Sequence, residues 1–358
     1  MVLRTVECWQ MREAGEPFVR ATREVELGPD QVLVQVAGCG VCHTDLSFAS
    51  GSVRTSRPPP ITLGHEVAGE VVEAGPAMGH LKGAAVVIPA VLPCGDCVLC
   101  TTGLAPICRS QVFLGSDVDG GFASHVVVPG RHLAVVDRAR LEPSGLALAD
   151  LGVVADAVST PYQAILRSGL SRGELAVVVG VGGVGGFAVQ LAAAQGAHVV
   201  AIDLDPERLR LALAHGAELA LDAGGLDRKA LRQAVLDHAE ARGLPRYGYK
   251  IFETSGHVAG QELAYSLLSY GGYLGVVGFS PRNISIRLGN LMAFHATAQG
   301  NWGCAPEHYP AILDLVLAGQ IQLAPFIEQR PMSAINQVFL ALANGELRKR
   351  PVLIPDFN

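Results

Sequence analysis

The chain is poor in charge and has no long uninterrupted hydrophobic run. Charged residues make up 17% of its 358 residues and hydrophobic ones 49%, a composition typical of a compact globular protein. No apolar run approaches the roughly 20 residues that a membrane span needs, and no signal peptide is recognisable at the start, which carries Arg4 and Glu7. The net charge of −6 offers no basic field to nucleic acid or anionic lipid. We therefore expect a cytoplasmic protein with neither kind of partner.

Cysteine is plentiful, but its distribution argues against a disulfide scaffold. Four of the eight cysteines lie within 94–108, a clustering that in a long chain indicates metal binding in a reducing compartment. Cys94-x₂-Cys97-x₂-Cys100-x₇-Cys108 supplies four thiolates, which close a tetrahedral zinc shell with no open position. An iron–sulfur cluster is the alternative, but its closest spacing has three residues and not seven before the last cysteine. We predict a structural zinc.

The pattern of the chain changes near residue 150, which divides it into two kinds of structure. Before this point, short alternating runs between Gly- and Pro-rich turns predict a β-rich, barrel-like module, with strands at 31–37, 66–73, 84–89 and 123–128. After it, predicted strands at 175–180, 198–202, 250–253 and 273–278 alternate with predicted helices at 186–195, 206–215, 230–242 and 261–268. Such alternation predicts a doubly wound parallel sheet. We assign residues 1–152 to the first domain, 153–298 to the second, and 299–358 to a tail that rejoins the first.

A GxGxxG motif follows the first predicted strand of the second domain and opens a helix. It reads Gly180-Val181-Gly182-Gly183-Val184-Gly185. Gly180 allows a tight turn, Gly182 lets the backbone approach a pyrophosphate, and Gly185 lets helix and strand pack closely. The alternative interpretation is an ordinary tight turn of an α/β protein.

A carboxylate at the end of the next strand supports the dinucleotide interpretation. Asp203 stands about 20 residues beyond the glycines, where it accepts hydrogen bonds from both ribose hydroxyls. Asp203 and the nearby Asp205 would repel a 2′-phosphate, and no arginine directly follows Asp203. NAD is therefore favoured over NADP.

A second candidate metal site lies in the segment GCGVCHTD and the tripeptide Gly-His-Glu that follows it. The Cys42 thiolate and the His65 imidazole are ligands that zinc accepts, and two ligands leave room for a third and for an open position. The Thr44 hydroxyl and the carboxylates of Asp45 and Glu66 lie beside them in the sequence. Two unrelated core residues are the alternative.

The third ligand of this catalytic zinc is predicted to be a carboxylate. Asp156 interrupts an otherwise apolar run, and its burial would need a cation or hydrogen-bond donors. Glu66 is the other candidate for the third ligand. The alternative interpretation of Asp156 is a carboxylate at a helix N-terminus that binds no metal. We interpret the other cysteines as small buried hydrophobes: Cys8, Cys39 and Cys304.

Together these segments resemble the medium-chain, zinc-dependent alcohol dehydrogenases over essentially the whole chain. The order GCGVCHTD, GHEVAGEVVEAG, four-cysteine lobe, GGFASHVVVP and GVGGVGG with its later Asp203 matches that family. The resemblance implies an α/β protein in which a GroES-like catalytic domain is joined to a Rossmann domain. It also implies NAD and two zinc ions per chain, and a homodimer or homotetramer.

The resemblance further implies a role for single residues. Cys42 and His65 match the first two catalytic zinc ligands, while Asp156 falls where many members have cysteine. Thr44 matches the residue that relays the substrate proton, and Ser47 falls where the family has a distal relay histidine. The other matches are the ligand-orienting carboxylates Asp45 and Glu66 and the cofactor contacts His43, Thr160, Val184 and Arg350.

The implied reaction is zinc-assisted oxidation of a secondary alcohol to a ketone. Residues 250–253, 288–296 and 300–304 also resemble the subfamily of 6-hydroxycyclohex-1-ene-1-carbonyl-CoA dehydrogenases of anaerobic benzoyl-CoA degradation, which implies a CoA thioester as substrate and its 6-oxo counterpart as product. Arg54 and Arg57 in the loop 52–60 are candidate contacts for CoA phosphates, with solvated surface charge as the alternative. Two other functions stay open: a dehydrogenase of simple secondary alcohols or polyols, and a non-catalytic sensor that binds zinc and NAD(H).

Overall fold

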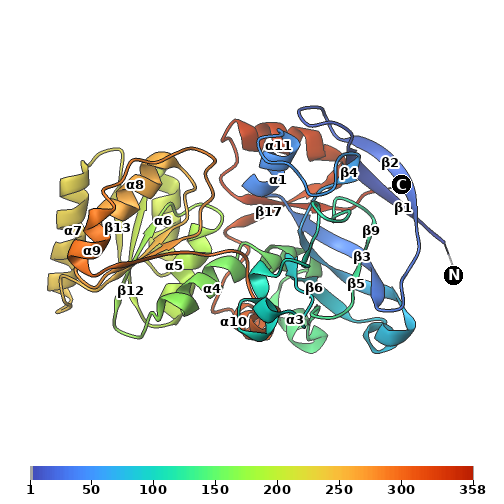
Figure 1. Ribbon diagram of the computed structural model, residues 1–358, viewed down its shortest axis with the longest axis horizontal. Coiled ribbons are helices and arrows are strands. Elements are labelled where there is room, and N and C mark those ends of the chain that lie inside the picture. The colour runs from blue at the N-terminus through green and yellow to red at the C-terminus, as the bar shows by residue number, and fades with distance from the viewer. Residues whose placement is uncertain (1–2, 358) are drawn as a thin grey trace. The chain divides into compact units, whose positions relative to one another are not determined.

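Two units account for residues 3–357, which the computed structural model describes. The first unit combines the residues up to 159 with 303–319 and those from 326 on, and the second combines 160–302 with 320–325 (Figure 1). The first unit reaches past the predicted boundary at 152 because the 3₁₀ segment Leu148–Ala155 packs on its strands. Residues 320–325, predicted to lie in the tail, instead belong to the second unit, where the Gln190 side chain hydrogen-bonds both backbone groups of Gln322.

The first unit is built on antiparallel strands. A three-stranded sheet has the order β2-β1-β4, and a larger sheet has the order β10-β6-β5-β3-β18-β17 with β9 also paired to β3. The bounds are β1 Arg4–Met11, β2 Val19–Val25, β3 Gln31–Gly40, β4 Ile61–Thr62, β5 Glu66–Ala74, β6 Ala85–Ile88, β7 Val91–Leu92, β8 Val112–Phe113, β9 His125–Pro129, β10 Ala134–Val135, β17 Ile327–Pro331 and β18 Arg350–Ile354. Five helices belong to this unit: α1 His43–Ala49, α2 Val98–Thr101, α3 Arg138–Ser144, α10 Tyr309–Leu317 and α11 Ile335–Ala343. The four predicted strands are confirmed as β3, β5, β6 and β9.

The pairing of β3 with β5 sets the position of the candidate catalytic site. Their antiparallel register places Gly40, at the end of β3, opposite Glu66, at the start of β5. The residues just after β3 and just before β5 therefore lie at the same edge of the sheet. Both strands are largely buried, so a slip in register would move their apolar side chains out of the core.

The second unit contains one parallel sheet with the order β13-β12-β11-β14-β15-β16, which is the strand order of dinucleotide-binding folds. Its strands are β11 Leu175–Val179, β12 His198–Asp203, β13 Leu219–Asp222, β14 Lys250–Glu253, β15 Tyr273–Val276 and β16 Thr297–Gly300. Its helices are α4 Ser159–Ser168, α5 Gly185–Ala194, α6 Pro206–Ala214, α7 Arg228–Ala241, α8 Val258–Ser266 and α9 Gly289–Phe294. The predicted alternation of strands and helices is confirmed, and β13 and β16 are additional to the predicted strands.

Within residues 3–357, no helix combines the length and the apolar character that crossing a membrane requires.

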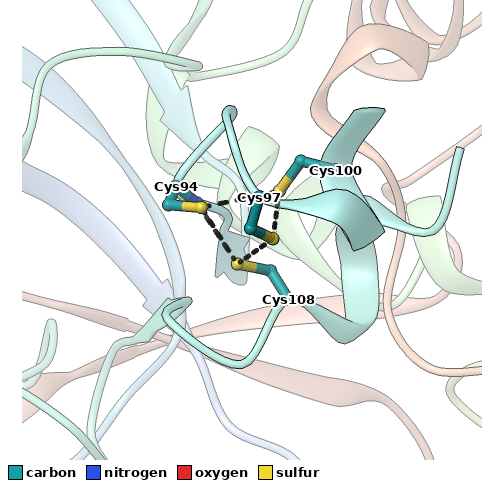
Figure 2. A group of neighbouring side chains, drawn as sticks. All are labelled: Cys94, Cys97, Cys100 and Cys108. Carbon is teal, nitrogen blue, oxygen red and sulfur yellow. Dashed lines mark hydrogen bonds between the residues drawn. The ribbon is translucent and has the colours of Figure 1, made fainter. Parts of the chain in front are cut away.

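Four sulfurs gather in the lobe formed by residues 94–108, as Figure 2 shows. Neighbouring sulfur pairs lie 3.5 to 3.8 Å apart, and backbone N–H groups of Cys94 and Gly95 point at two of the sulfurs. Four Zn–S bonds of about 2.3 Å in a regular tetrahedron separate the sulfurs by about 3.8 Å. A polynuclear iron cluster would hold its sulfurs farther apart, because they bind different irons. The lobe fits a single zinc ion with a closed ligand shell.

Removing one lobe thiolate should remove one zinc ion per chain. We expect two zinc ions in the wild-type protein and one in Cys100→Ala, because three thiolates no longer close the shell. Cys8→Ala, which changes a buried cysteine of β1 outside the lobe, is the matched control and should keep both ions. Elemental analysis of the purified proteins measures this. Iron in place of zinc, or an unchanged zinc content in Cys100→Ala, would contradict the assignment.

Candidate catalytic site

Cys42 is held by the start of the helix that follows β3. It is the N-cap residue of α1, its Sγ accepts a hydrogen bond from the Thr44 N–H at 3.2 Å, and its own N–H donates to Asp45 at 3.1 Å. This reciprocal arrangement is a capping box, in which two side chains satisfy helix N–H groups that otherwise lack partners. The sequence Cys-His-Thr-Asp therefore starts a helix and orients a thiol at the same time.

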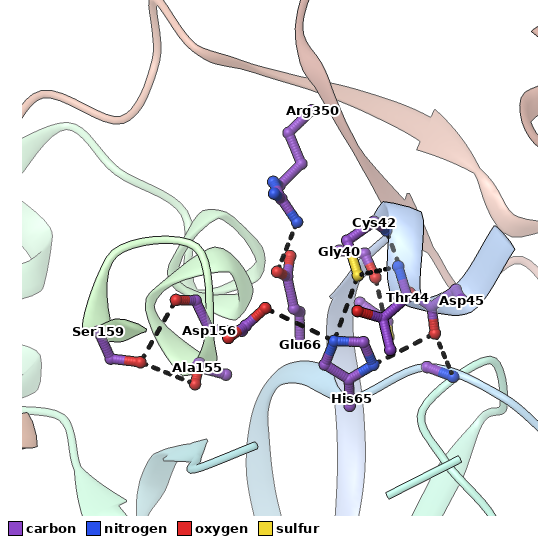
Figure 3. Close-up of polar contacts among 12 residues, drawn as sticks. Gly40, Cys42, Thr44, Asp45, His65, Glu66, Ala155, Asp156, Ser159 and Arg350 are labelled. Carbon is purple, nitrogen blue, oxygen red and sulfur yellow. Dashed lines mark hydrogen bonds and ion pairs between the residues drawn. The ribbon is translucent and has the colours of Figure 1, made fainter. Parts of the chain in front are cut away.

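His65 is oriented by the same aspartate. Asp45 Oδ1 accepts from the Gly64 N–H at 3.2 Å and lies 3.3 Å from His65 Nδ1. Gly64 has φ of 99°, and a Cβ there would lie 2.7 Å from Cys39 Sγ, so this turn requires glycine. With Nδ1 facing a carboxylate, Nε2 is left for a metal. It lies 3.3 Å from Cys42 Sγ (Figure 3).

Two further carboxylates complete the cluster. Asp156, at the end of the 3₁₀ segment, places Oδ2 at 3.7 Å from His65 Nε2. Glu66 is fully buried and accepts from Arg350 Nη1 at 2.6 Å through Oε1, while Oε2 has no hydrogen-bond partner among the described residues. Cys42, His65, Glu66 and Asp156 each offer a ligand atom within 4.8 Å of the others. The structure thus brings both predicted third-ligand candidates to one point.

The electrostatics of this cluster reflect excess negative charge in a buried place. Burial by itself would lower the pKa of His65, but the Asp45 carboxylate and the Cys42 thiolate outweigh it and raise that pKa well above its usual value. Burial raises the pKa of Glu66 to about 7, although Arg350 opposes the shift. Several acidic groups gathered in one largely buried place would be stabilised by a nearby cation.

The donor set fits zinc. One thiolate, one imidazole and one carboxylate are a catalytic type of ligand set that leaves the fourth position to substrate. Bonds of about 2.3 Å to sulfur and 2.0 Å to nitrogen at a tetrahedral angle separate these atoms by about 3.5 Å, close to the 3.3 Å between Cys42 Sγ and His65 Nε2. The buried Glu66 Oε2 without a partner is a second sign that a cation belongs nearby.

The other predicted residues of the first unit lie in different environments. Thr44 sits in the first turn of α1 beside Cys42, and Ser47 lies one turn later with its hydroxyl donating to the His43 carbonyl at 2.8 Å. His43 is exposed, whereas Arg350 is buried against Glu66. The remaining cysteines, Cys8, Cys39 and Cys304, are buried as predicted.

The arginines of the loop 52–60 differ from one another. Arg57 forms an ion pair with Asp119 at 2.5 Å, and the same carboxylate also lies 3.4 Å from Arg23. Arg54 is exposed to solvent. Of the two predicted contacts for CoA phosphates, Arg57 is therefore already committed to a carboxylate within the protein.

The glycine motif forms a tight turn in the second unit. Gly180 has φ of 87°, and a Cβ on Gly185 would lie 1.9 Å from the Gly180 carbonyl oxygen, so neither position tolerates a side chain. Asp203 Oδ2 accepts from the Val181 N–H at 2.7 Å, which fixes this carboxylate at the turn. Thr160, predicted to contact the nicotinamide, is buried near the start of α4, where its carbonyl accepts from the Asn301 side chain at 3.1 Å.

Arg208, in the first turn of α6, lies beside the glycine turn and was not predicted from the sequence. A Cβ on Gly182 would meet nothing closer than the Arg208 Nη1 atom at 3.5 Å, and Arg208 Nε is buried with no hydrogen-bond partner among residues 3–357. A guanidinium thus lies beside the backbone that phosphates approach. The available signal was its place in the first turn of the helix that begins after Asp205, but helix-surface arginines are too common for that position to stand out.

Comparison with known proteins agrees with both halves of the structure. Residues 28–138 match the alcohol dehydrogenase GroES-like domain, and residues 183–318 match the zinc-binding dehydrogenase family. An alcohol dehydrogenase of Rhizobium meliloti (strain 1021) is 32% identical over 346 residues, which cover 96% of this chain and 97% of that protein. An NAD-dependent alcohol dehydrogenase of Sulfolobus acidocaldarius is 30% identical over 358 residues, which cover 96% of this chain and 98% of that protein.

Solved structures give the same answer. A zinc-binding dehydrogenase of Sinorhizobium meliloti 1021 bound to NADP has a TM-score of 0.84 and 25% identity, and the similarity covers 98% of this chain and all of that one. The predicted fold, a GroES-like domain with a Rossmann domain, is confirmed. The two groups of candidate ligand residues fit the predicted zinc ions, and the glycine turn fits the predicted nicotinamide cofactor. The chain belongs to the zinc-dependent medium-chain alcohol dehydrogenase family.

Proposed function

We propose that this protein oxidises a secondary alcohol to a ketone and passes the hydride to NAD⁺. The observation that carries the proposal is that the buried thiol of Cys42, the buried imidazole of His65 and the half-buried carboxylate of Asp156 offer ligand atoms within 4.8 Å of one another. Zinc held by these three groups supplies the Lewis acidity that makes a substrate hydroxyl acidic enough to lose its proton near neutral pH. Asp156 is favoured over Glu66 as the third ligand, because Glu66 already forms an ion pair with Arg350.

The residues around the ligands orient the imidazole and carry the substrate proton. Asp45 keeps His65 in the tautomer that binds through Nε2. Thr44, in the first turn of α1, receives the substrate proton. Ser47 takes the place that the family resemblance assigns to a relay histidine, and its hydroxyl donates to the His43 carbonyl, so we expect the proton to reach water without an imidazole on the route.

Asp203 supports NAD in preference to NADP. Its Oδ1 accepts from the N–H groups of Leu204 and Asp205 at 2.7 and 3.0 Å and its Oδ2 from Val181, so three backbone donors fix the position of a side chain that would repel a 2′-phosphate. Arg208 beside Gly182 is proposed to face the cofactor phosphates. The contacts proposed for His43, Thr160, Val184 and Arg350 complete the cofactor site.

For the substrate we propose 6-hydroxycyclohex-1-ene-1-carbonyl-CoA, which would be oxidised to the 6-oxo compound in anaerobic aromatic degradation. The support is the sequence of residues 250–253, 288–296 and 300–304, which resembles dehydrogenases of that substrate. Arg54, exposed in the loop 52–60, is the proposed contact for CoA phosphates. A simple secondary alcohol or polyol is the second candidate, favoured by the alcohol dehydrogenases among the relatives.

We also propose that the protein works as a homodimer or homotetramer in the cytoplasm. The eight cysteines are all unpaired, which suits a reducing compartment. Strand β16 lies at the edge of its sheet, and an edge strand exposes backbone groups that can pair with another chain. Nearby α9 exposes Met292 (81%), and Leu288 before it is also exposed (67%), so apolar surface lies beside that edge.

A substrate panel with metal analysis tests the proposed reaction. Purified protein with NAD⁺ should form NADH from the CoA ester with a kcat/KM at least about tenfold above that of simple secondary alcohols, a difference of about 1.4 kcal/mol. Asp156→Ala should bind the catalytic zinc more weakly, retain less of it on purification and lose activity, while Glu66→Gln should keep the zinc. If the protein oxidises free alcohols but not the CoA ester, the substrate is the second candidate, a simple secondary alcohol or polyol. No turnover at all, with about one zinc per chain and a metal content unchanged in Asp156→Ala, would identify a non-catalytic sensor.

A methyl group at Gly182 should weaken cofactor binding without destabilising the fold. The position has room within the protein, with the nearest atom 3.5 Å away, but the added methyl group would occupy the approach of the pyrophosphate. We expect Gly182→Ala to raise the Kd for NADH at least about tenfold, or 1.4 kcal/mol, with an unchanged thermal unfolding midpoint. Gly289→Ala, at another uncrowded glycine of this unit, should change neither quantity. Preference of the wild-type protein for NADP⁺ over NAD⁺ would contradict the role of Asp203.

Introducing charge beside the β16 edge should disrupt the oligomer. Light scattering after size exclusion should give a dimer or tetramer for the wild-type protein and a larger monomer fraction for Met292→Lys, because a buried lysine without a partner is costly in an interface. Leu213→Lys changes an exposed leucine of α6 in the same unit and should leave the mass unchanged. A monomeric wild-type protein would end this proposal.

A further inference from the structure

A pair of buried hydroxyl groups lies behind the turn that carries Asp156. Tyr309 opens α10 and is completely buried, and its hydroxyl donates to the Ala155 carbonyl at 2.5 Å. The Ser159 hydroxyl lies 3.1 Å from the Tyr309 oxygen, 3.0 Å from the Ala155 carbonyl and 3.5 Å from the Asp156 carbonyl. Figure 3 shows the serine side of this arrangement.

We propose that Tyr309 and Ser159 are positioning residues that hold the Asp156 carboxylate at the catalytic zinc. The inference rests on the proposed function, since it requires Asp156 to be a ligand. Neither hydroxyl reaches the ligand atoms. Both act on the backbone next to Asp156, and the Ala90 N–H adds a third donor to the Ala155 carbonyl at 3.3 Å.

The three proposed ligands are held in different ways. Cys42 is the cap of a helix, and His65 is held through its ring by Asp45. Asp156 closes a 3₁₀ segment, and its short side chain moves with its backbone. Because Zn–O bonds lie within about 2.0 to 2.2 Å, a small shift of the peptide before Asp156 would take the oxygen out of range. The Tyr309 hydroxyl and the Ala90 N–H both donate to the Ala155 carbonyl, and the Ser159 hydroxyl lies within hydrogen-bond distance of it, so these groups fix that peptide.

A purely stabilising role makes a different prediction from a positioning role. A buried tyrosine that only fills the core would change the free energy of unfolding and leave the affinity of a folded site for zinc unchanged. The chain contains a matched case: Tyr249 is also buried, and its hydroxyl donates to the Leu267 carbonyl at 2.5 Å. Replacing either tyrosine by phenylalanine removes one hydroxyl that donates to a backbone carbonyl, but only Tyr309 lies behind a ligand.

The test compares zinc affinity in Tyr309→Phe and Tyr249→Phe. Chelator competition on the folded holoenzyme measures both zinc ions, and the lobe zinc serves as an internal reference. We expect Tyr309→Phe to bind the catalytic zinc at least about tenfold more weakly, within the range found when residues that orient metal ligands are changed. The lobe zinc should be unaffected, and Tyr249→Phe should match the wild type. Cobalt substituted at the catalytic site should show an altered absorption spectrum in Tyr309→Phe only.

A double-mutant cycle connects the effect to Asp156. In the Asp156→Ala background, Tyr309→Phe should cause no further loss of affinity, because the group that it positions is gone. A further loss in that background would overturn the inference, as would wild-type affinity and cobalt spectrum in Tyr309→Phe. If Tyr309→Phe does not fold, Ser159→Ala is judged by the same measurements. If Asp156→Ala itself keeps the wild-type affinity, the proposed ligand set is wrong, a result distinct from failure of the positioning role alone.

Discussion

The carboxylate of Asp45 is the group on which the candidate catalytic site depends. It is fully buried, and it accepts hydrogen bonds from Cys42 and from Gly64 while facing the ring of His65. One side chain therefore connects the segment after β3 with the segment before β5. Because the strand register already brings these segments to the same edge, the carboxylate has only to orient groups that the sheet has placed. A buried charge with three partners is stable where an unpaired one would not be.

The ion pair between Glu66 and Arg350 connects the candidate catalytic site to the C-terminal strand β18. Arg350 begins β18, which pairs with β3 and β17, so the C-terminal segment supplies a positive charge to the centre of the first unit. Cys42, Asp45, Glu66 and Asp156 gather four acidic groups around one guanidinium and one imidazole. A divalent metal ion is the group that these donors would bind, and it would favour the ionised form of its ligands.

The sequence predicted what depends on local spacing and left out what depends on distant partners. The glycine turn, the four-cysteine lobe and the Cys42 and His65 pair all lie in short segments whose residue types have few other uses. The pairing of Arg350 with Glu66 joins residues 284 positions apart, and Tyr309 reaches Ala155 across 154. Neither contact can be recognised from the local sequence, because the residues next to an arginine or a tyrosine do not show which distant group it will meet. The return of residues 320–325 to the second unit escaped prediction for the same reason.

The three proposed ligands of the catalytic zinc are each held by a different kind of contact. Cys42 is fixed by a helix cap, His65 by a carboxylate on its ring, and Asp156 by hydroxyl groups on its backbone. The first two contacts and that of Ser159 come from residues within about 20 positions of the ligand, but Tyr309 reaches Ala155 from 154 positions away. On the proposed ligand set, the C-terminal segment takes part in the metal site, because the Tyr309 hydroxyl holds the peptide that precedes Asp156.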